Sequence, residues 1–203
     1  METIFEGIYR SNGWASQGSV SGPGSTKERA QDFVAELVDA VRNLGAFTLL
    51  DAPCGDFNWA APVADAVERY LGVDVVSNLV RENERRYGSP QRRFLHLDLV
   101  NESLPEADVI LCRDCLVHFS FSDVGRALTN FRRSGSRYLI TTTFVGEREN
   151  TDIETGGWRP LNLQRTPFNL PPPLALIDEH CHHTGGIYAD KRLGIWSIRD
   201  LPG

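Results

Sequence analysis

The chain has 203 residues, which is long enough for one good hydrophobic core and short for two full domains. Its net charge of −6 argues against nonspecific binding of nucleic acid, which requires a basic surface. The sequence has one small basic patch, at Arg85, Arg86, Arg92 and Arg93, which is interpreted as a solvated helix end and loop. No apolar run reaches the roughly 18–20 residues of a membrane span, and the acidic N-terminus lacks the layout of a signal peptide, so a cytoplasmic protein is expected.

The first 25 residues combine aromatic residues with a run rich in glycine and serine. Phe5, Tyr9 and Trp14 precede the sequence GSVSGPGS at 18–25. Disordered tails are generally poor in aromatic residues, so this segment is predicted to be an ordered loop that packs on the domain. Ser25 then begins a predicted capping box with Glu28, and a helix with apolar residues at helical spacing follows and closes at Gly45.

Strands and helices alternate in the middle of the chain. The first predicted strand ends at Asp51, and the elements that follow it are a helix at 59–69, a strand at 70–73, a helix at 77–87, a strand at 94–97, a strand at 107–112, a helix at 123–133 and a strand at 137–142. This alternation predicts an α/β fold with a mostly parallel sheet and helices on both faces.

Residues 145–173 break this alternation, because they are polar, carry Gly156 and Gly157, and show no helical period. A segment of this length inside a domain is expected to be a functional lid or insertion, and Trp158 and Arg159 would give it a flat apolar face and an anion-binding fork. Glu154 and Asn162 belong to the same expected lid. Two apolar runs, at 174–177 and 193–198, predict a terminal antiparallel pair of strands.

The cysteine and histidine residues do not predict a metal site. Cys112 and Cys115 have CxxC spacing but lie in or just after a predicted buried strand, and no second pair of ligands accompanies them. Cys181, His182 and His183 are adjacent, and adjacent ligands cannot easily converge on one ion, so they are interpreted as loop or strand-edge residues.

The turn after the first predicted strand, within LLDAPCGDFNW at 49–59, indicates the kind of ligand. Dinucleotide sites use the pattern Gly-x-Gly-x-x-Gly so that the backbone can approach a pyrophosphate. This turn has Gly55 alone, with Pro53 and Phe57 where glycines would be expected, so a pyrophosphate would fit poorly. Asp51 and Asp56 would suit a positive ammonium or sulfonium group instead.

Two more acids follow predicted strands. Asp74 lies where a carboxylate can accept hydrogen bonds from both ribose hydroxyls, and Asp98 can accept one from an adenine amino group while the backbone of Leu99 meets the ring edge. Each acid alone has the alternative interpretation of a helix cap or turn residue. Together the three strand ends describe a site for S-adenosylmethionine.

The run from 49 to 123 resembles the class I S-adenosylmethionine-dependent methyltransferases. In this resemblance the turn at 51–56 takes the place of the first glycine-rich motif, with two glycines lost, while Asp74 is the ribose acid and Asp98 the adenine acid. The segment CRDCLVHF at 112–119 resembles the family's segment after the fourth strand, where many members hold an active-site polar residue. Residues 21–25 and DAPCGDFNW look like a bacterial subgroup of this family. The resemblance implies a Rossmann-like seven-stranded sheet in the order 3-2-1-4-5-7-6, with the seventh strand antiparallel.

The candidate site residues follow from these arguments. The cofactor-binding candidates are Asp51, Pro53, Gly55, Asp56, Trp59, Asp74, Asp98, Leu99 and Arg113, with Trp14, Ser21 and Ser25 covering the cofactor from the N-terminal side. The catalytic candidates are His118, Asp114 and Arg113. His118 is the candidate general base, with packing under the next helix as the alternative, and Arg113 or Asp114 would contact the methionine moiety or, for Arg113, an acidic substrate. Thr141, Thr142 and Thr143 are weaker pocket candidates.

The expected function is transfer of a methyl group from S-adenosylmethionine to a small molecule, as an O- or N-methylation of a natural-product or metabolite intermediate, with S-adenosylhomocysteine as product. The chain is expected to form a single methyltransferase domain with a covering segment at 1–25, a core at 26–144, a lid at 145–173 and a strand pair at 174–203. Two alternatives stay open, namely a noncatalytic S-adenosylmethionine-binding protein and a nicotinamide-dependent oxidoreductase on a similar sheet.

Overall fold

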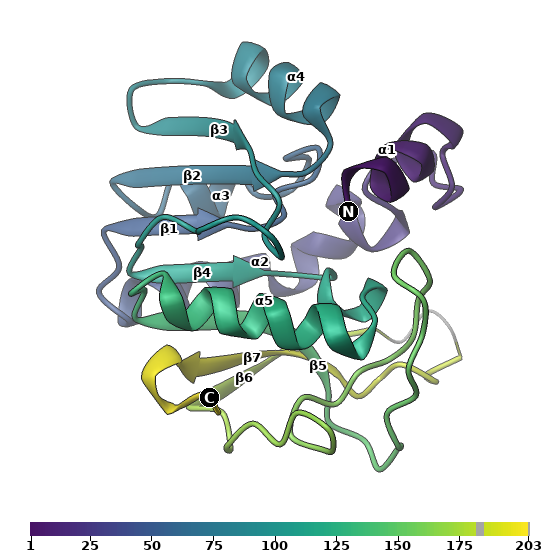
Figure 1. Ribbon diagram of the computed structural model, residues 1–203. Helices are drawn as coiled ribbons and strands as arrows, with labels where there is room; N and C mark the ends of the chain where they lie inside the picture. The colour runs from purple at the N-terminus through teal and green to yellow at the C-terminus, as the bar shows by residue number, and fades with distance from the viewer. Residues whose placement is uncertain (182–184, 203) are drawn as a thin grey trace.

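One mixed sheet of seven strands organises the part of the chain that the computed structural model describes, residues 1–181 and 185–202 (Figure 1). The strands are β1 Thr48–Asp51, β2 Arg69–Asp74, β3 Arg92–His96, β4 Val109–Cys112, β5 Tyr138–Phe144, β6 Ala175–Asp178 and β7 Lys191–Ser197. Their spatial order is β3-β2-β1-β4-β5-β7-β6. Strands β1 to β5 pair in parallel, whereas β7 is antiparallel to both β5 and β6. The expected sheet order, the antiparallel seventh strand and the terminal strand pair are therefore confirmed.

Helices cover both faces of this sheet. They are α1 Glu2–Ser11, α2 Lys27–Asn43, α3 Ala61–Ala64, α4 Ser77–Tyr87 and α5 Phe121–Arg133, with short 3-10 turns at Pro23–Ser25, Leu116–His118 and Ile198–Asp200. In Figure 1, α5 lies in front of the sheet and α2 behind it. Val124, Ala127 and Phe131 of α5 join one hydrophobic cluster, while Phe33 and Leu37 of α2 join the other. These residues lie three or four apart, so each helix presents one apolar stripe to the sheet.

The N-terminal segment is ordered as predicted, but its first part is a helix rather than a loop. Ile4, Phe5 and Ile8 lie on one side of α1 because their spacing matches a helical turn, and the Phe5 ring packs 5.9 Å from the Phe119 ring. None of the residues of α1 is fully buried. The helix lies beside the carboxyl ends of the parallel strands, at the right of Figure 1.

Two local predictions are wrong. The helix expected at 59–69 is limited to α3, and Arg69 already begins β2, where its N–H donates to the Phe47 carbonyl oxygen at 3.0 Å. The capping box at Ser25 does not form, because Ser25 belongs to a 3-10 turn and Thr26 becomes the N-cap of α2 without a side-chain hydrogen bond.

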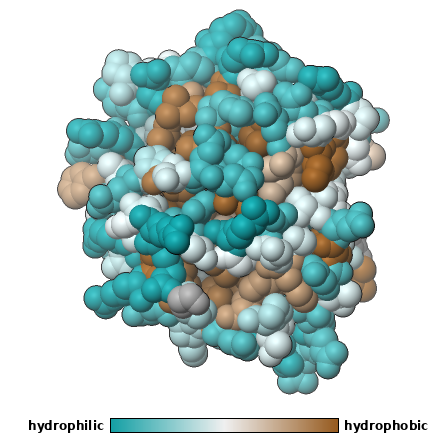
Figure 2. All heavy atoms as spheres, in the orientation of Figure 1, coloured by the Kyte–Doolittle hydropathy of each residue, from teal (hydrophilic) through white to brown (hydrophobic). Residues whose placement is uncertain are grey.

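The segment 145–173 contains no helix or strand. Its second half nevertheless packs in the core, because Leu161, Leu163, Phe168 and Leu170 are buried in the hydrophobic cluster that also includes α5. The face shown in Figure 2 is largely hydrophilic, with apolar side chains in separate patches. Among the described helices, none is both long and apolar enough to cross a membrane.

Candidate active site

A cavity opens at the carboxyl ends of the parallel strands. Thr141, Thr142 and Thr143, the weaker pocket candidates, are buried and do not line it, whereas every cofactor-binding and catalytic candidate named from the sequence does. These residues are Trp14, Ser21, Ser25, Asp51, Pro53, Gly55, Asp56, Trp59, Asp74, Asp98, Leu99, Arg113, Asp114 and His118. We refer to this space as the first cavity. Met1, together with Phe5 and Tyr9 of α1, also lines it. The sequence predicts that this segment covers the cofactor, but these three residues were not among the site candidates because the helix was not predicted.

The turn after β1 is bound to a strap formed by residues 19–25. Gly55 has a φ of 54°, and a Cβ atom there would collide with Ser21 Oγ. That hydroxyl oxygen accepts a hydrogen bond from the Asp56 N–H at 2.9 Å. The Asp56 carboxylate accepts from the Ser19 hydroxyl at 2.8 Å and from the Val20 N–H at 3.1 Å. Asp56 thus lines the cavity and holds the strap in place at the same time.

Asp51 and Asp74 are buried carboxylates at the ends of β1 and β2. Asp51 accepts a hydrogen bond of 2.5 Å from the Tyr70 hydroxyl, and Asp74 accepts from the N–H groups of Gly55 at 3.1 Å and Val76 at 2.9 Å. Burial raises the pKa of Asp51 to about 7 and that of Asp74 to about 6. Among the described residues, no cation forms an ion pair with either one. The first cavity is therefore suited to a ligand that brings positive charge and hydroxyl donors.

Asp98 organises the turn after β3. Its carboxylate accepts from the N–H of Val100 at 2.9 Å and from the side-chain amide of Asn101 at 2.7 Å, while it also lines the cavity. Asp98 therefore acts as a turn residue, which was the alternative interpretation of this acid from the sequence. Leu99 beside it is buried, and its carbonyl oxygen accepts from Asn130 Nδ2 at 3.0 Å.

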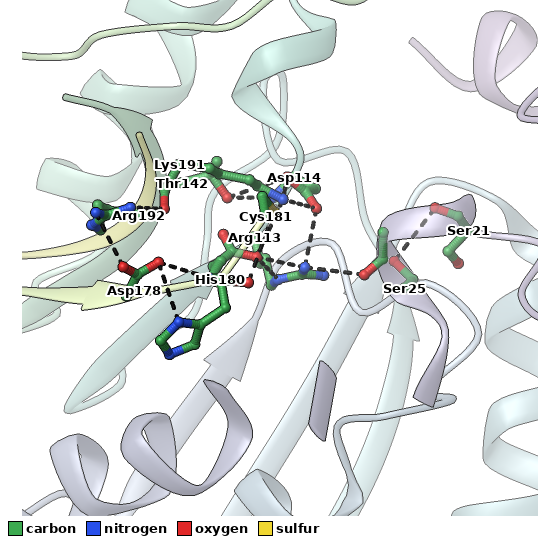
Figure 3. A network of polar contacts seen from close by, with 12 residues as sticks. Ser21, Ser25, Arg113, Asp114, Thr142, Asp178, His180, Cys181, Lys191 and Arg192 are labelled. Atoms are coloured by element: carbon green, nitrogen blue, oxygen red, sulfur yellow. Dashed lines mark hydrogen bonds and ion pairs between the residues drawn. The ribbon is translucent and has the colours of Figure 1, made fainter. Parts of the chain in front are cut away.

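A cluster of four charged residues lies beyond β4, and Figure 3 labels three of them, Arg113, Asp114 and Lys191. Arg113 donates to Glu179 Oε2 from Nε at 2.9 Å and from Nη2 at 2.6 Å, and its Nη2 also donates to the Gly24 carbonyl oxygen at 3.0 Å. Lys191 Nζ lies 2.7 Å from Asp114 and 3.2 Å from Glu179 Oε2. We call Arg113, Asp114, Glu179 and Lys191 the charged cluster.

These contacts bear on the expected roles of Arg113 and Asp114. The guanidinium of Arg113 is already engaged by a buried carboxylate and stacks over the ring of Phe33 at 4.6 Å, so this geometry gives it a positioning role. Burial by itself raises the pKa of Asp114, but the charges of Lys191 and Arg113 outweigh it and hold the pKa below its usual range. An ionised carboxylate paired in this way is a weak proton acceptor, so the geometry favours His118 over Asp114 as the base.

His118 lies on the 3-10 turn after β4, and its ring is fixed from two sides. Its Nδ1 lies 2.7 Å from the Gly157 carbonyl oxygen, which can only accept, so Nδ1 carries the proton and Nε2 keeps its lone pair. The Trp14 ring packs against the imidazole with centroids 4.2 Å apart. Burial lowers the pKa of His118, which keeps the ring neutral near pH 7. This is the state that a general base requires.

Arg159 does not form the predicted anion-binding fork. It is buried, and its guanidinium donates to the carbonyl oxygens of Leu116 at 2.9 Å, Phe119 at 2.7 Å and Thr151 at 3.2 Å. Because Nε, Nη1 and Nη2 of Arg159 each donate to a backbone carbonyl oxygen, these groups are not available to bind an anion. Arg159 instead supports the turn that carries His118.

A second cavity adjoins the first and shares Trp14, Ser21, Ser25, Arg113, Asp114 and His118 with it. Its other walls include Phe144, Trp158 and Tyr188, whose rings contact one another at centroid distances of 5.1 to 6.3 Å. Glu179 and Lys191 complete the inner wall. The sequence did not indicate these two residues, because they approach Arg113 and Asp114 only through the pairing of β5, β6 and β7.

The described residues contain no group of three or more histidine, cysteine, aspartate or glutamate side chains that could hold a metal ion. Burial raises the pKa of the Cys54 and Cys115 thiols, so they stay protonated. His182 and His183, expected to be loop or strand-edge residues, lie outside the described residues.

Comparisons with known proteins agree with this geometry. Residues 49–135 match the family model of a methyltransferase domain. An uncharacterized methyltransferase of Mycobacterium tuberculosis (strain ATCC 25618 / H37Rv) is 32% identical over 162 residues, covering 72% of this chain and 80% of that protein, and its Mycobacterium bovis counterpart matches equally.

Two solved structures show the same fold at low sequence identity. The N-methyltransferase NodS from Bradyrhizobium japonicum WM9, in complex with S-adenosyl-L-homocysteine, has a TM-score of 0.56 at 13% identity, covering 70% of this chain and 73% of that chain. Magnesium protoporphyrin IX methyltransferase from Synechocystis PCC 6803, with bound S-adenosylmethionine, has a TM-score of 0.54 at 20% identity, covering 74% of this chain and 79% of that chain. With the sequence relatives, these findings identify the chain as a member of the class I S-adenosylmethionine-dependent methyltransferases.

Proposed function

We propose that this methyltransferase transfers the methyl group to an oxygen or nitrogen atom of a small molecule, a metabolite or natural-product intermediate, bound in the second cavity. The observation that carries the proposal is the position of His118. It lines both cavities and keeps its Nε2 lone pair because Nδ1 is bound by the Gly157 carbonyl oxygen. A base at the junction of the two cavities is placed to act on an acceptor that faces the cofactor.

The residues of the first cavity fit S-adenosylmethionine. Asp74 keeps a further lone pair on each carboxylate oxygen beside its two backbone hydrogen bonds, which suits two ribose hydroxyls. Asp98 and Leu99 line the same cavity at the adenine end. Asp51 would offset the positive charge of the cofactor, and the strap would cover it. In this assignment, contacts with the strap stabilise the DAPCGDFNW turn, which lacks two glycines of the family's first motif. Such a turn would be the distinguishing feature of a subgroup of the family.

The bound cofactor supplies a methyl group on a positively charged sulfonium. The protein's own contribution begins with His118, whose Nε2 accepts the proton that the acceptor hydroxyl or amine loses. Gly157 and Trp14 hold the imidazole ring, and Arg159 fixes the turn below it. The aromatic walls of the second cavity exclude water from the reacting groups.

The loop around Gly156 is proposed to cover the acceptor. Its N–H donates to the His118 carbonyl oxygen at 2.9 Å, and a Cβ atom at Gly156, which has a φ of 104°, would lie 2.7 Å from Ile4 Cγ2. Trp158 is 42% exposed and lines the second cavity. The lid that we propose consists of the first half of 145–173 together with α1.

Calorimetric titration with S-adenosylmethionine and S-adenosylhomocysteine, with NAD as a control, tests the cofactor site. Family membership already counts against a nicotinamide-dependent enzyme. The acceptor is tested by incubating the protein with labelled S-adenosylmethionine and a small-molecule extract, with His118→Ala in parallel. Labelled small molecules that the variant does not produce would support the proposal. Tight cofactor binding without any labelled product would favour the noncatalytic alternative.

A further inference from the structure

The charged cluster is balanced among its own members. Arg113 and Lys191 carry two positive charges, and Asp114 and Glu179 carry two negative charges, each connected to at least one partner within 3.3 Å. Arg113 and Glu179 are buried, with side chains 5% and 1% exposed. Such a cluster needs no additional ion to neutralise it, because each buried charge already has a counterpart.

One oxygen of this cluster has no donor. Arg113 and Lys191 both approach Oε2 of Glu179, whereas Oε1 is buried and has no hydrogen-bond partner among the residues that the structure describes. Glu179 lines the second cavity beside Lys191. A buried carboxylate oxygen without a donor is uncommon in folded proteins and unfavourable. A ligand in the second cavity can provide the donor.

The charge balance indicates which kind of donor fits. An ammonium group at Oε1 would introduce a third cation near the Arg113 guanidinium and the Lys191 ammonium, which lie 2.6 and 3.2 Å from the other oxygen of the same carboxylate. Two cations already bound to one carboxylate repel a third positive charge in a poorly solvated site. A hydroxyl group donates the same hydrogen bond without adding charge.

We infer that Glu179 recognises the methyl acceptor, and that the acceptor is a neutral compound with at least two hydroxyl groups. One hydroxyl faces His118 and receives the methyl group, while another donates to Glu179 Oε1. The rings of Phe144, Trp158 and Tyr188 provide an apolar wall for the body of this compound. This inference rests on the proposed function, since it takes the second cavity as the acceptor site.

Three matched compounds test the inference on the protein saturated with S-adenosylhomocysteine. Catechol has two hydroxyls, guaiacol has one of them methylated, and 2-hydroxybenzylamine has one replaced by a cationic aminomethyl group. Binding is followed by NMR titration, and the indole N–H signals of Trp14 and Trp158 report on the second cavity. Catechol is expected to bind about tenfold more tightly than either of the others, because only catechol retains a neutral second donor. Equal binding of catechol and guaiacol, or tightest binding of the amine, would overturn the inference.

The variant Glu179→Gln assigns the preference to this residue. Arg113 requires an oxygen acceptor, so the glutamine keeps its carbonyl oxygen there and places its NH₂ group where Oε1 was. The preference for catechol over guaiacol should then disappear, whereas Asp178→Asn, whose carboxylate pairs with Arg192, should retain it. A preference that persists in Glu179→Gln would come from the size of the methyl group and would refute the role of Glu179.

Two measurements separate this inference from the proposed function. Failure of the wild-type protein to bind S-adenosylhomocysteine would contradict the cofactor assignment itself. Normal binding of S-adenosylhomocysteine without a preference among the three compounds would contradict only the role of Glu179. The comparison among compounds on the wild-type protein needs no variant, so it decides the question even if Glu179→Gln is unstable.

Discussion

Ionisation of Asp51 should destabilise the cofactor-free protein, and Asp51→Asn should remove this effect. Burial raises the pKa of Asp51 from 3.8 to about 7. An acid whose pKa is higher in the folded state costs no stability below its unfolded pKa, and the cost grows as the pH rises to the folded pKa. The folded and unfolded pKa values of 7 and 3.8 differ by about three units, and each unit corresponds to about 1.4 kcal/mol. Ionisation of Asp51 therefore lowers the free energy of unfolding by about 4 kcal/mol above pH 7.

Urea unfolding at about pH 5 and about pH 8 measures this cost. At about pH 5 the unfolded aspartate is already ionised, so a little under half of the cost is present, and the rest, about 2–3 kcal/mol, appears by about pH 8. The stability of Asp51→Asn relative to wild type should therefore increase by about 2–3 kcal/mol over this interval. Asp39→Asn, with a side chain 72% exposed on α2, controls for the loss of an acid. A stability difference between Asp51→Asn and wild type that does not change with pH would refute the reasoning.

Three further variants test the assigned roles. Asp74→Ala should weaken binding of S-adenosylhomocysteine at least about a hundredfold in calorimetry, because two charge-assisted hydrogen bonds of about 1.5–3 kcal/mol each are lost; unchanged affinity would exclude the ribose role. His118→Ala should keep that affinity and slow methylation roughly 10²–10⁴-fold, and the wild-type rate should fall at a pH below the usual pKa of histidine because burial lowers the pKa of His118. Gly55→Ala should lower both the Tm and cofactor affinity by displacing Ser21, whereas Gly7→Ala, which meets no neighbouring atom, should be harmless; equal effects of the two would show that the strap contact is unimportant.

The strand ends could be predicted from the sequence because the relevant signals are local. Asp51 and Asp74 each follow a short apolar run, and in a parallel sheet such ends meet at one edge whatever the loops do. The helix predicted at 77–87 has the bounds of α4 for the same reason, since its apolar spacing and its ends lie within one stretch. The candidates of the first cavity were therefore accessible without a structure.

The residues that were missed or misassigned depend on distant contacts. Arg159 looked like an anion ligand because a loop arginine beside glycines has no evident partner in sequence, yet two of its three acceptors lie about forty residues earlier. Glu179 is 66 residues from Arg113, and no spacing rule connects an acid after an edge strand with an arginine after β4. The order of the strands decides which charged residues meet across a sheet. That order was predicted from the family resemblance and not from a local sequence pattern.

The same contacts indicate which of two segments near the site can open at the lower cost in free energy. The half of 145–173 that contains Leu161 and Phe168 is anchored by buried apolar side chains, so its opening would expose core surface. The strap is held mainly by polar contacts, from Asp56, from Ser21 and from Arg113 to the Gly24 carbonyl oxygen, and α1 buries none of its residues completely. Polar contacts of this kind can be exchanged for contacts with water at little cost, whereas buried apolar surface cannot. Residues 1–25 are therefore expected to open at a lower cost in free energy than the second half of 145–173.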